Sequence, residues 1–388
     1  MARNPFRPTA GATPPLLVGR LEVVDEFADS LDDGPGAPGR LALFTGPRGV
    51  GKTVMLNEAG DQALRRGWVT ISETATPGMV SRLRHATTRA LREADSTSAP
   101  TRSITGVTLP VIGGGVTLSA APEDVVDWRH ELGLLLGALE RSRTGLLITV
   151  DEVHRGARDD LRDLAATVQH LVREDRDVAL AMAGLTSAVS DLLSDDVLTF
   201  LRRADRFELR DVPLDDVAAA LGHTIRSEGR EIDDDALEYA ARATGGYPFM
   251  IQLVGYHVWR KATGDRIDLA AAHEGVPAAQ KRLGSLVHET ALGDLSDVDR
   301  TYLVAMAQDT SESSTGAIAE RMGVTPHYAS TYRGRLIDAG VIEPTRYGYV
   351  DFAIPYLREY LREHATRDEM AARQLPFTGG GRRGRRAR

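Results

Sequence analysis

The first 212 residues alternate between two hydrophobic patterns. Short, mainly apolar runs predict strands that are buried on both faces, as in a parallel sheet. These runs cover residues 41–45, 68–72, 146–152, 178–183 and 206–209. Between them, apolar positions recur at helical spacing, which predicts helices over residues 21–31, 54–64, 77–94, 123–142, 161–172 and 189–193. Strands that alternate with helices predict an α/β fold, in which helices flank a parallel sheet.

The pattern changes at Pro213. Four helices are predicted, with no strand between them, over residues 214–227, 234–244, 248–263 and 277–291. Pro248 ends the run Gly245-Gly-Tyr-Pro and suits the first turn of the third helix, where the missing N–H costs no hydrogen bond. We therefore expect an all-α lid over residues 213–293.

A third pattern covers residues 294–365. Ser296 and Thr325 are capping residues for two of its predicted helices. The helices are predicted over residues 297–308, 315–322, 326–339 and 356–364, with a β-hairpin made by residues 340–344 and 347–352. Two helices joined by a turn and followed by a hairpin predict a winged helix-turn-helix.

Three further stretches are read from composition. Residues 1–15 are rich in Pro, Thr and Ala and predict an extended segment. Two β-rich runs flank three glycines and predict a hairpin insertion over residues 104–119, whose glycines favour a mobile turn over a phosphate loop. Residues 366–388 predict a disordered basic tail.

The loop after the first strand reads G-x-x-x-x-G-K-T, the spacing of a phosphate-binding P-loop, or Walker A motif. Its strand and helix supply the context that the motif requires. Lys52 is expected to reach the β- and γ-phosphates, and Thr53 to hold Mg²⁺. The residues expected to contact the nucleotide here are Gly46, Pro47, Arg48, Gly49, Val50, Gly51, Lys52, Thr53 and Val54.

Two carboxylates end the strand over residues 146–152. Asp151 is placed to bind Mg²⁺ opposite Thr53, and Glu152 to polarise the attacking water, as in a Walker B motif. The alternative for the pair is an N-cap of the next helix.

Polar and basic residues follow later in the same domain. Thr186 or Ser187, after the strand over residues 178–183, could orient water toward the γ-phosphate or cap the helix over 189–193. Arg202, Arg203 and Arg206 precede the last strand.

The chain carries a net charge of −8 and no cysteine, which excludes disulfides and thiolate metal sites. The N-terminus lacks an apolar signal sequence, and the apolar run over residues 132–139 is too short to span a bilayer, so a soluble, cytoplasmic protein is expected. The segment 365–388 carries seven arginines and two carboxylates, which leaves −13 for the rest. This basic end is either an arm for a polyanion or a solubilising tail.

The predicted recognition helix and hairpin carry candidate DNA contacts: His327, Tyr328, Thr331, Arg333, Arg335 and Arg346. Residues 311–365 nevertheless hold six basic and seven acidic side chains, whereas a DNA reader usually has a basic footprint. Protein docking by this domain is therefore the alternative.

Taken in order, these features resemble AAA+ ATPases, in particular the branch that contains origin-recognition-type initiators and archaeal and STAND-type ATPases. The resemblance covers roughly residues 14–365, and the composition is similar to that of actinobacterial ATP-binding proteins. It implies ATP and Mg²⁺ as ligands, since no Asn-Lys-x-Asp guanine motif occurs in the chain.

The resemblance also implies roles for single residues. Leu17 to Arg20, with Val18 and Gly19, matches the adenine-side entry motif, and Thr186 falls at the sensor-1 position. Gly246 to Pro248 matches the Gly-x-Pro element by which STAND lids contact the base. An arginine finger is expected from Arg202, Arg203 or Arg206, with Arg203 as the candidate. No clear sensor-2 arginine follows Gly246, which departs from the initiators.

These observations predict a slow ATP hydrolase that acts as a nucleotide-dependent switch and binds DNA or a protein through its winged helix. Expected partners are DNA, a protein or further copies of the chain, and no membrane. The alternative is a nucleotide-sensing transcriptional regulator with little turnover. Asp151 to His154 also spells a D-E-x-H helicase box, but the chain turns all-helical after Pro213 where a helicase needs a second α/β core.

Overall fold

The computed structural model describes residues 3–9, 11–14, 17–96, 128–153, 157–194, 196–293 and 295–372. The chain divides into two compact units, Met1–Leu283 and Gly284–Arg388. The hairpin predicted over residues 104–119 lies outside the described residues. Within the described part, no helix is both long and apolar enough to cross a membrane.

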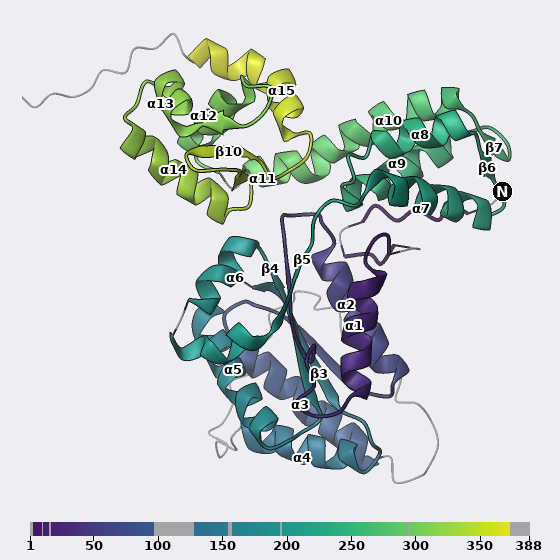
Figure 1. The fold of residues 1–388 in the computed structure, drawn as a ribbon, viewed down its shortest axis with the longest axis vertical. Helices are drawn as coiled ribbons and strands as arrows, with labels where there is room; N and C mark the ends of the chain where they lie inside the picture. Colours follow the sequence, from purple (N-terminus) through teal and green to yellow (C-terminus); the bar gives the residue numbers. More distant parts are fainter. Residues whose placement is uncertain are drawn as a thin grey trace, which may run out of the picture. The chain divides into compact units, whose positions relative to one another are not determined.

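The first unit is built on a five-stranded parallel sheet (Figure 1). Its strands run in the order β2-β3-β4-β1-β5, and each paired neighbour is parallel. The bounds are β1 Leu41–Thr45, β2 Val69–Thr74, β3 Leu146–Val153, β4 Val178–Gly184 and β5 Asp205–Glu208. All five strands lie where the apolar runs predicted them, and the parallel sheet with its flanking helices is confirmed.

Helices cover both faces of this sheet because alternate strand residues point to opposite sides. On β1, Phe44 packs with Phe27 and Met55 of the helices α1 and α2, whereas Leu43 joins the core on the other face. The helices on the first face are α1 Leu21–Asp32 and α2 Lys52–Arg65. Those on the second are α3 Met79–Ser96, α4 Trp128–Glu140, α5 Arg158–Arg173, α6 Thr186–Leu193 and the 3-10 helix η2 Asp196–Arg203.

After Pro213 the first unit continues as a helical segment (Figure 1). Its helices are α7 Leu214–Ser227, α8 Asp234–Arg242, α9 Pro248–Lys261 and α10 Leu269–Leu283. The prediction of an all-α segment was wrong in one respect, because β6 Glu231–Ile232 pairs in parallel with β7 Arg266–Ile267. A two-residue strand is too short to leave a periodic signal in the sequence.

The start of the fourth helix was also predicted wrongly. Pro277 lies inside α10, which begins at Leu269, and the chain then continues as a π-helical turn, η3 Gly284–His288, and α11 Glu289–Gly293. Proline removes one helical hydrogen bond. The buried face of α10, which includes Ala272 and Val276, outweighs that loss by packing on α9, so the helix extends through the proline.

The N-terminal segment is attached to the helical segment rather than merely extended. Phe6 is only 4% exposed and lies against Gly255 of α9. The Asn4 side-chain amide donates a 3.0 Å hydrogen bond to the Tyr256 carbonyl, and the Arg7 N–H donates to Gln252. Further along, Asn57 of α2 donates to the carbonyl of Gly11. The segment therefore contacts both the helical segment and the P-loop helix.

The second unit combines helices with the three-stranded antiparallel sheet β8-β10-β9. Ser296 and Asp299 form a capping box, and Thr325 accepts the Tyr328 N–H, so both predicted caps are confirmed. The elements are α12 Asp297–Ala307, β8 Ser313–Ser314, α13 Thr315–Met322, α14 Pro326–Asp338, β9 Ile342–Pro344, β10 Tyr349–Phe352 and α15 Leu357–Ala372. Helix α15 ends beyond residue 364 and so enters the stretch predicted as a disordered tail.

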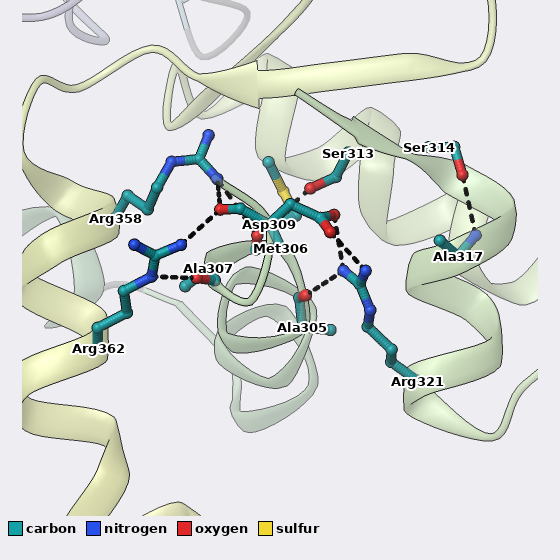
Figure 2. A network of polar contacts seen from close by, with 10 residues as sticks. All are labelled: Ala305, Met306, Ala307, Asp309, Ser313, Ser314, Ala317, Arg321, Arg358 and Arg362. Atoms are coloured by element: carbon teal, nitrogen blue, oxygen red, sulfur yellow. Dashed lines mark hydrogen bonds and ion pairs between the residues drawn. The ribbon is translucent and has the colours of Figure 1, made fainter. Parts of the chain in front are cut away.

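Three arginines bind the end of α12 and the loop after it (Figure 2). Arg321 donates to both oxygens of Asp309 and to the Ala305 carbonyl. Arg358 and Arg362 of α15 both donate to the Asp309 backbone carbonyl. These bonds satisfy carbonyls that a helix end leaves without partners, and so fix α13 and α15 to α12.

Candidate nucleotide-binding site

The P-loop connects β1 to α2 and depends on its glycines. Gly46, Gly49 and Gly51 all have positive φ, and Gly51 precedes Lys52, the first residue of α2. A Cβ on Gly46 would stand 2.4 Å from the Leu209 carbonyl oxygen, so a larger residue does not fit there. The loop therefore takes a shape that brings backbone N–H groups and a helix N-terminus together, which is an anion-binding arrangement.

Lys52 lies inside this loop. Its Nζ donates to the carbonyls of Gly46 at 3.0 Å and Pro47 at 2.6 Å. Burial lowers the pKa of Lys52, and the carboxylates of Glu152 and Asp151 oppose that shift. The ammonium is thus partly stripped of water and close to both predicted carboxylates, where a phosphate chain would compete for it.

Thr53 and Asp151 meet at the end of β3. The Thr53 hydroxyl donates a 2.6 Å hydrogen bond to Asp151 Oδ2. Because the hydroxyl uses its proton here, its oxygen lone pairs stay available for a cation. The described residues contain no group of three His, Cys, Asp or Glu side chains that could hold a metal. Mg²⁺ at phosphate sites commonly takes one or two protein oxygens together with phosphate and water, so this donor pair fits it.

Glu152 has an unusual backbone that the sequence did not reveal. Its φ is +55°, in the left-handed region, and its N–H donates to Asp151 Oδ1. The register between β3 and β4 shifts between Val150 and Val153, so β3 carries one extra residue there. Such bulges re-aim side chains next to functional sites. The N-cap alternative for these carboxylates is wrong, because α5 begins at Arg158 with Ala157 as its cap.

The positions of the other predicted catalytic residues, Thr186 and Arg203, do not by themselves indicate a catalytic role. Thr186 is the first residue of α6, and Leu185, without a side-chain cap, precedes it. The alternative that Thr186 or Ser187 caps this helix is therefore wrong, while its sensor role stays a prediction. Arg202 and Arg203 are both exposed at the end of η2, and Arg202 also donates to the Leu193 carbonyl.

Two motifs that are distant in sequence meet at the start of the helical segment. Gly19 lies beside Val212, and the Arg20 guanidinium donates to the Arg210 carbonyl. The Val212 N–H donates to the Gly246 carbonyl at 2.8 Å. Gly246 and Gly19 therefore both contact Val212, and Pro248 is the first residue of α9; their contact with a nucleotide stays a prediction.

This junction also holds charged groups away from bulk water. Burial lowers the pKa of Arg20, and the nearby Asp211 carboxylate opposes the shift. Burial likewise raises the pKa of Asp211, and Arg20 opposes it. Each group therefore stabilises the charged form of the other.

In the second unit, the predicted DNA contacts lie on or near α14. His327, Tyr328 and Thr331 are exposed. Arg335 pairs with Asp299 at 2.9 Å and Arg346 with Glu312 at 2.6 Å. Arg333 is partly buried, and its Nε has no hydrogen-bond partner among the described residues. Sequence reasoning missed Tyr347, which is fully exposed at the turn between β9 and β10.

Comparison with known families matches two parts of the chain. Residues 16–182 match the AAA ATPase domain, and residues 285–361 match a domain of unknown function (DUF8462). No curated protein matches the sequence.

Solved structures with a similar fold cover nearly the whole chain. The Walker-type ATPase PABY2304 of Pyrococcus abyssi is 15% identical, with a TM-score of 0.64 over 89% of this chain and 96% of that one. The Aeropyrum pernix ORC2 protein, in ADPNP–ADP complexes, is 14% identical, with a TM-score of 0.59 over 94% of this chain and 98% of that one. In its ADP form the TM-score is 0.51.

The sheet order, the P-loop and the carboxylates that end β3 define a P-loop nucleoside triphosphatase core. Residues 16–182 match the AAA ATPase domain, which confirms the resemblance to AAA+ ATPases over that part of the chain. The archaeal Walker-type ATPase and ORC2 share the fold of this chain.

Proposed function

We propose that this protein is an ATP hydrolase that binds Mg²⁺ and ATP at its P-loop and acts as a slow, nucleotide-dependent switch. The observation that carries the proposal is the Thr53–Asp151 hydrogen bond beside Lys52. It joins the two predicted Mg²⁺ ligands, from segments 98 residues apart, within reach of the phosphate-binding loop. The nucleotide complexes of the similarly folded ORC2 support the same reading.

The residues divide the chemistry between them. Thr53 and Asp151 would supply the protein oxygens that hold Mg²⁺, and the ion, when bound, would neutralise phosphate charge. Lys52 exchanges its two backbone carbonyls for phosphate oxygens and stabilises the charge that shifts during cleavage. Glu152, aimed by the bulge, accepts a proton from the attacking water.

Two further roles belong to the same proposal. Thr186, at the end of β4 between β1 and β3, orients that water. Arg203 is exposed and so available to a neighbouring copy as an arginine finger. A finger supplies about 10³–10⁵ in rate, so a lone chain should turn over slowly and turnover should rise with protein concentration.

Lys52→Ala tests the core of this proposal. Removing one buried charged partner costs roughly 2–5 kcal/mol, so ATP affinity should fall at least about thirtyfold. Lys281→Ala, a change of the same type in α10, is the control and should bind ATP normally. Unchanged ATP affinity and hydrolysis in Lys52→Ala, with the chain still folded by thermal unfolding, would show the proposal to be wrong.

We further propose that the second unit is a winged helix that binds DNA or a protein partner. Its support is the order α13, α14 and the β9–β10 hairpin, with His327, Tyr328 and Thr331 exposed on α14. The internal ion pairs of Arg335 and Arg346 mean that a phosphate must displace a carboxylate to use either side chain. This weakens affinity for DNA and leaves protein docking as the alternative.

A salt titration separates the two partners. DNA binding should weaken as salt rises, and Arg346→Ala should reduce the salt slope by about one phosphate contact. Arg242→Ala, which removes an exposed arginine paired with Glu238 in α8, should leave the slope unchanged. If no DNA fragment binds at low salt with or without ATP, both the DNA-coupled switch and the transcriptional regulator are excluded, and a protein partner remains.

A further inference from the structure

We propose that Tyr247 is a positioning residue for the phosphate loop: its hydroxyl holds the Arg48 carbonyl and thereby sets the direction of the Gly49 N–H. This inference rests on the proposed ATP site and adds to it a contact from the helical segment. The inference also gives Tyr247, the middle residue of Gly246 to Pro248, a function that is separate from contact with a base.

The turn that carries Tyr247 is rigidly built. The fully buried Thr244 hydroxyl donates to the Ala241 carbonyl at 2.7 Å and accepts the Gly246 N–H at 3.0 Å. Gly245 and Gly246 both have positive φ. A Cβ on Gly246 would stand 2.3 Å from the Val212 carbonyl oxygen, so the turn packs directly on the backbone that leads into α7.

Tyr247 then reaches the P-loop. Its side chain is 1% exposed, and its hydroxyl donates a 3.1 Å hydrogen bond to the Arg48 carbonyl. A Cβ on Gly49 would stand only 1.7 Å from that hydroxyl oxygen and 2.5 Å from the ring carbon that bears it. Glycine at position 49 is thus required by the tyrosine as well as by its φ of +76°.

The geometry of the peptide bond turns this contact into control of a donor. A trans, planar peptide directs its C=O and its N–H to opposite sides, and the described residues include no cis peptide bond. A C=O that faces Tyr247 therefore directs the Gly49 N–H away from Tyr247. Loops of this kind bind phosphate through such N–H groups, and without the hydroxyl this peptide is free to rotate.

The hydroxyl is suited to act as a permanent donor. Burial raises the pKa of Tyr247 well above its ordinary value, and the Asp211 carboxylate adds to the shift. The hydroxyl therefore keeps its proton at neutral pH. The ring fills the space over Gly49, and the hydroxyl makes the directional bond, so the two contributions can be tested separately.

Tyr247→Phe in the full chain keeps the ring and removes the hydroxyl. We expect kcat/KM for ATP to fall about five- to tenfold, as for loss of one hydrogen bond, and the Kd for ADP to rise by a similar factor. Amide exchange of residues 46–53 should accelerate, whereas the thermal midpoint should change little. Tyr239→Phe is the matched control in α8, because Tyr239 stacks on His273; it should alter none of these quantities.

Unchanged kcat/KM and unchanged loop exchange in a folded Tyr247→Phe protein would overturn the inference. If that variant is too unstable to assay, Thr244→Val loosens the same turn without touching the P-loop. It should also lower kcat/KM for ATP, and an unchanged kcat/KM would contradict the role proposed for Tyr247. Lys52→Ala tests the proposed ATP site separately. If that proposal is wrong, Lys52→Ala would bind ATP as tightly as the unmodified chain.

Discussion

Phe6 lies so close to Gly255 that a Cβ on this glycine would stand 2.4 Å from the aromatic ring. Glycine inside a helix normally destabilises it by roughly 1 kcal/mol relative to alanine. Here the missing side chain creates the space that Phe6 fills, so the Phe6 side chain belongs to the packed interior of the first unit.

Gly255→Ala should therefore destabilise the first unit although alanine favours helices. Expelling or displacing Phe6 costs about 1–3 kcal/mol, which exceeds the gain in helix propensity. Chemical denaturation measures the change, and limited proteolysis should cut residues 3–14 faster. Gly133→Ala in α4 is the control, since its Cβ would meet nothing within 4 Å and alanine should stabilise there by up to about 1 kcal/mol. Equal effects at the two positions would contradict the role given to Phe6.

Glu152→Gln should separate ATP binding from hydrolysis. The amide keeps the size of the side chain but cannot accept the water's proton, so kcat should fall roughly 10²–10⁴-fold while ATP still binds. Single-turnover hydrolysis and equilibrium nucleotide binding provide the two readouts. Turnover retained at the original rate would assign the proton acceptor to another residue.

Acidification should destabilise the second unit through His288. This side chain is 1% exposed, its Nε2–H donates a 2.9 Å hydrogen bond to the Pro355 carbonyl, and its ring packs edge-on against Tyr360. Burial lowers its pKa; the Pro355 bond and Glu359 oppose the shift, and His364 adds to it. As pH falls through about 6.5, the unfolded chain therefore binds the proton first, and stability is lost.

Amide exchange of residues 284–361 at pH 7.5 and 5.5, corrected for intrinsic rates, measures this effect. His288→Phe should flatten the pH dependence, because the native and unfolded chains then no longer differ in proton binding at this position. His327→Gln, on the exposed side of α14, should preserve it. A His288→Phe protein that keeps the full pH dependence would rule out His288 as its source.

Arg321→Ala should weaken the second unit by about 1–2 kcal/mol. It removes charge-assisted bonds to Asp309 and leaves the Ala305 carbonyl without this donor (Figure 2). The Arg321 and Asp309 side chains are both 26% exposed, so water weakens their ion pair and the loss of stability should lie at the lower end of the range for charged pairs. Denaturant unfolding provides the measurement, and Arg242→Ala, from an exposed pair in α8, should change stability by less than about 0.5 kcal/mol. If Arg321→Ala and Arg242→Ala changed the stability equally, the stabilising role given to Arg321 would be wrong.

Much of this architecture could be predicted because it depends on local pattern. The apolar runs of β1, β3 and β4 are buried on both faces. The P-loop could be recognised from the spacing of its glycines, lysine and threonine alone. Ser296 and Thr325 cap helices through bonds that span only a few residues. In each case the physical cause lies within a short stretch of chain.

The features that escaped prediction depend on contacts across the chain. The docking of Phe6 requires a glycine 249 positions away, and the bulge at Glu152 depends on the register with β4. Pro277 appeared to begin a helix because the packing of α10 against α9, which carries the helix through this proline, leaves no local signal. Arg335 and Arg346 looked available for phosphate until the structure showed their carboxylate partners.

The placement of Thr53 and Asp151 has a consequence for how the protein is made. Strand β4 lies between β1 and β3, so the bond between these residues needs a sheet that includes residue 184. A growing chain that has exposed only the P-loop has no complete nucleotide site. On the proposed function, nucleotide would stabilise only chains in which the central strands have already paired, and its binding would report that the core is complete.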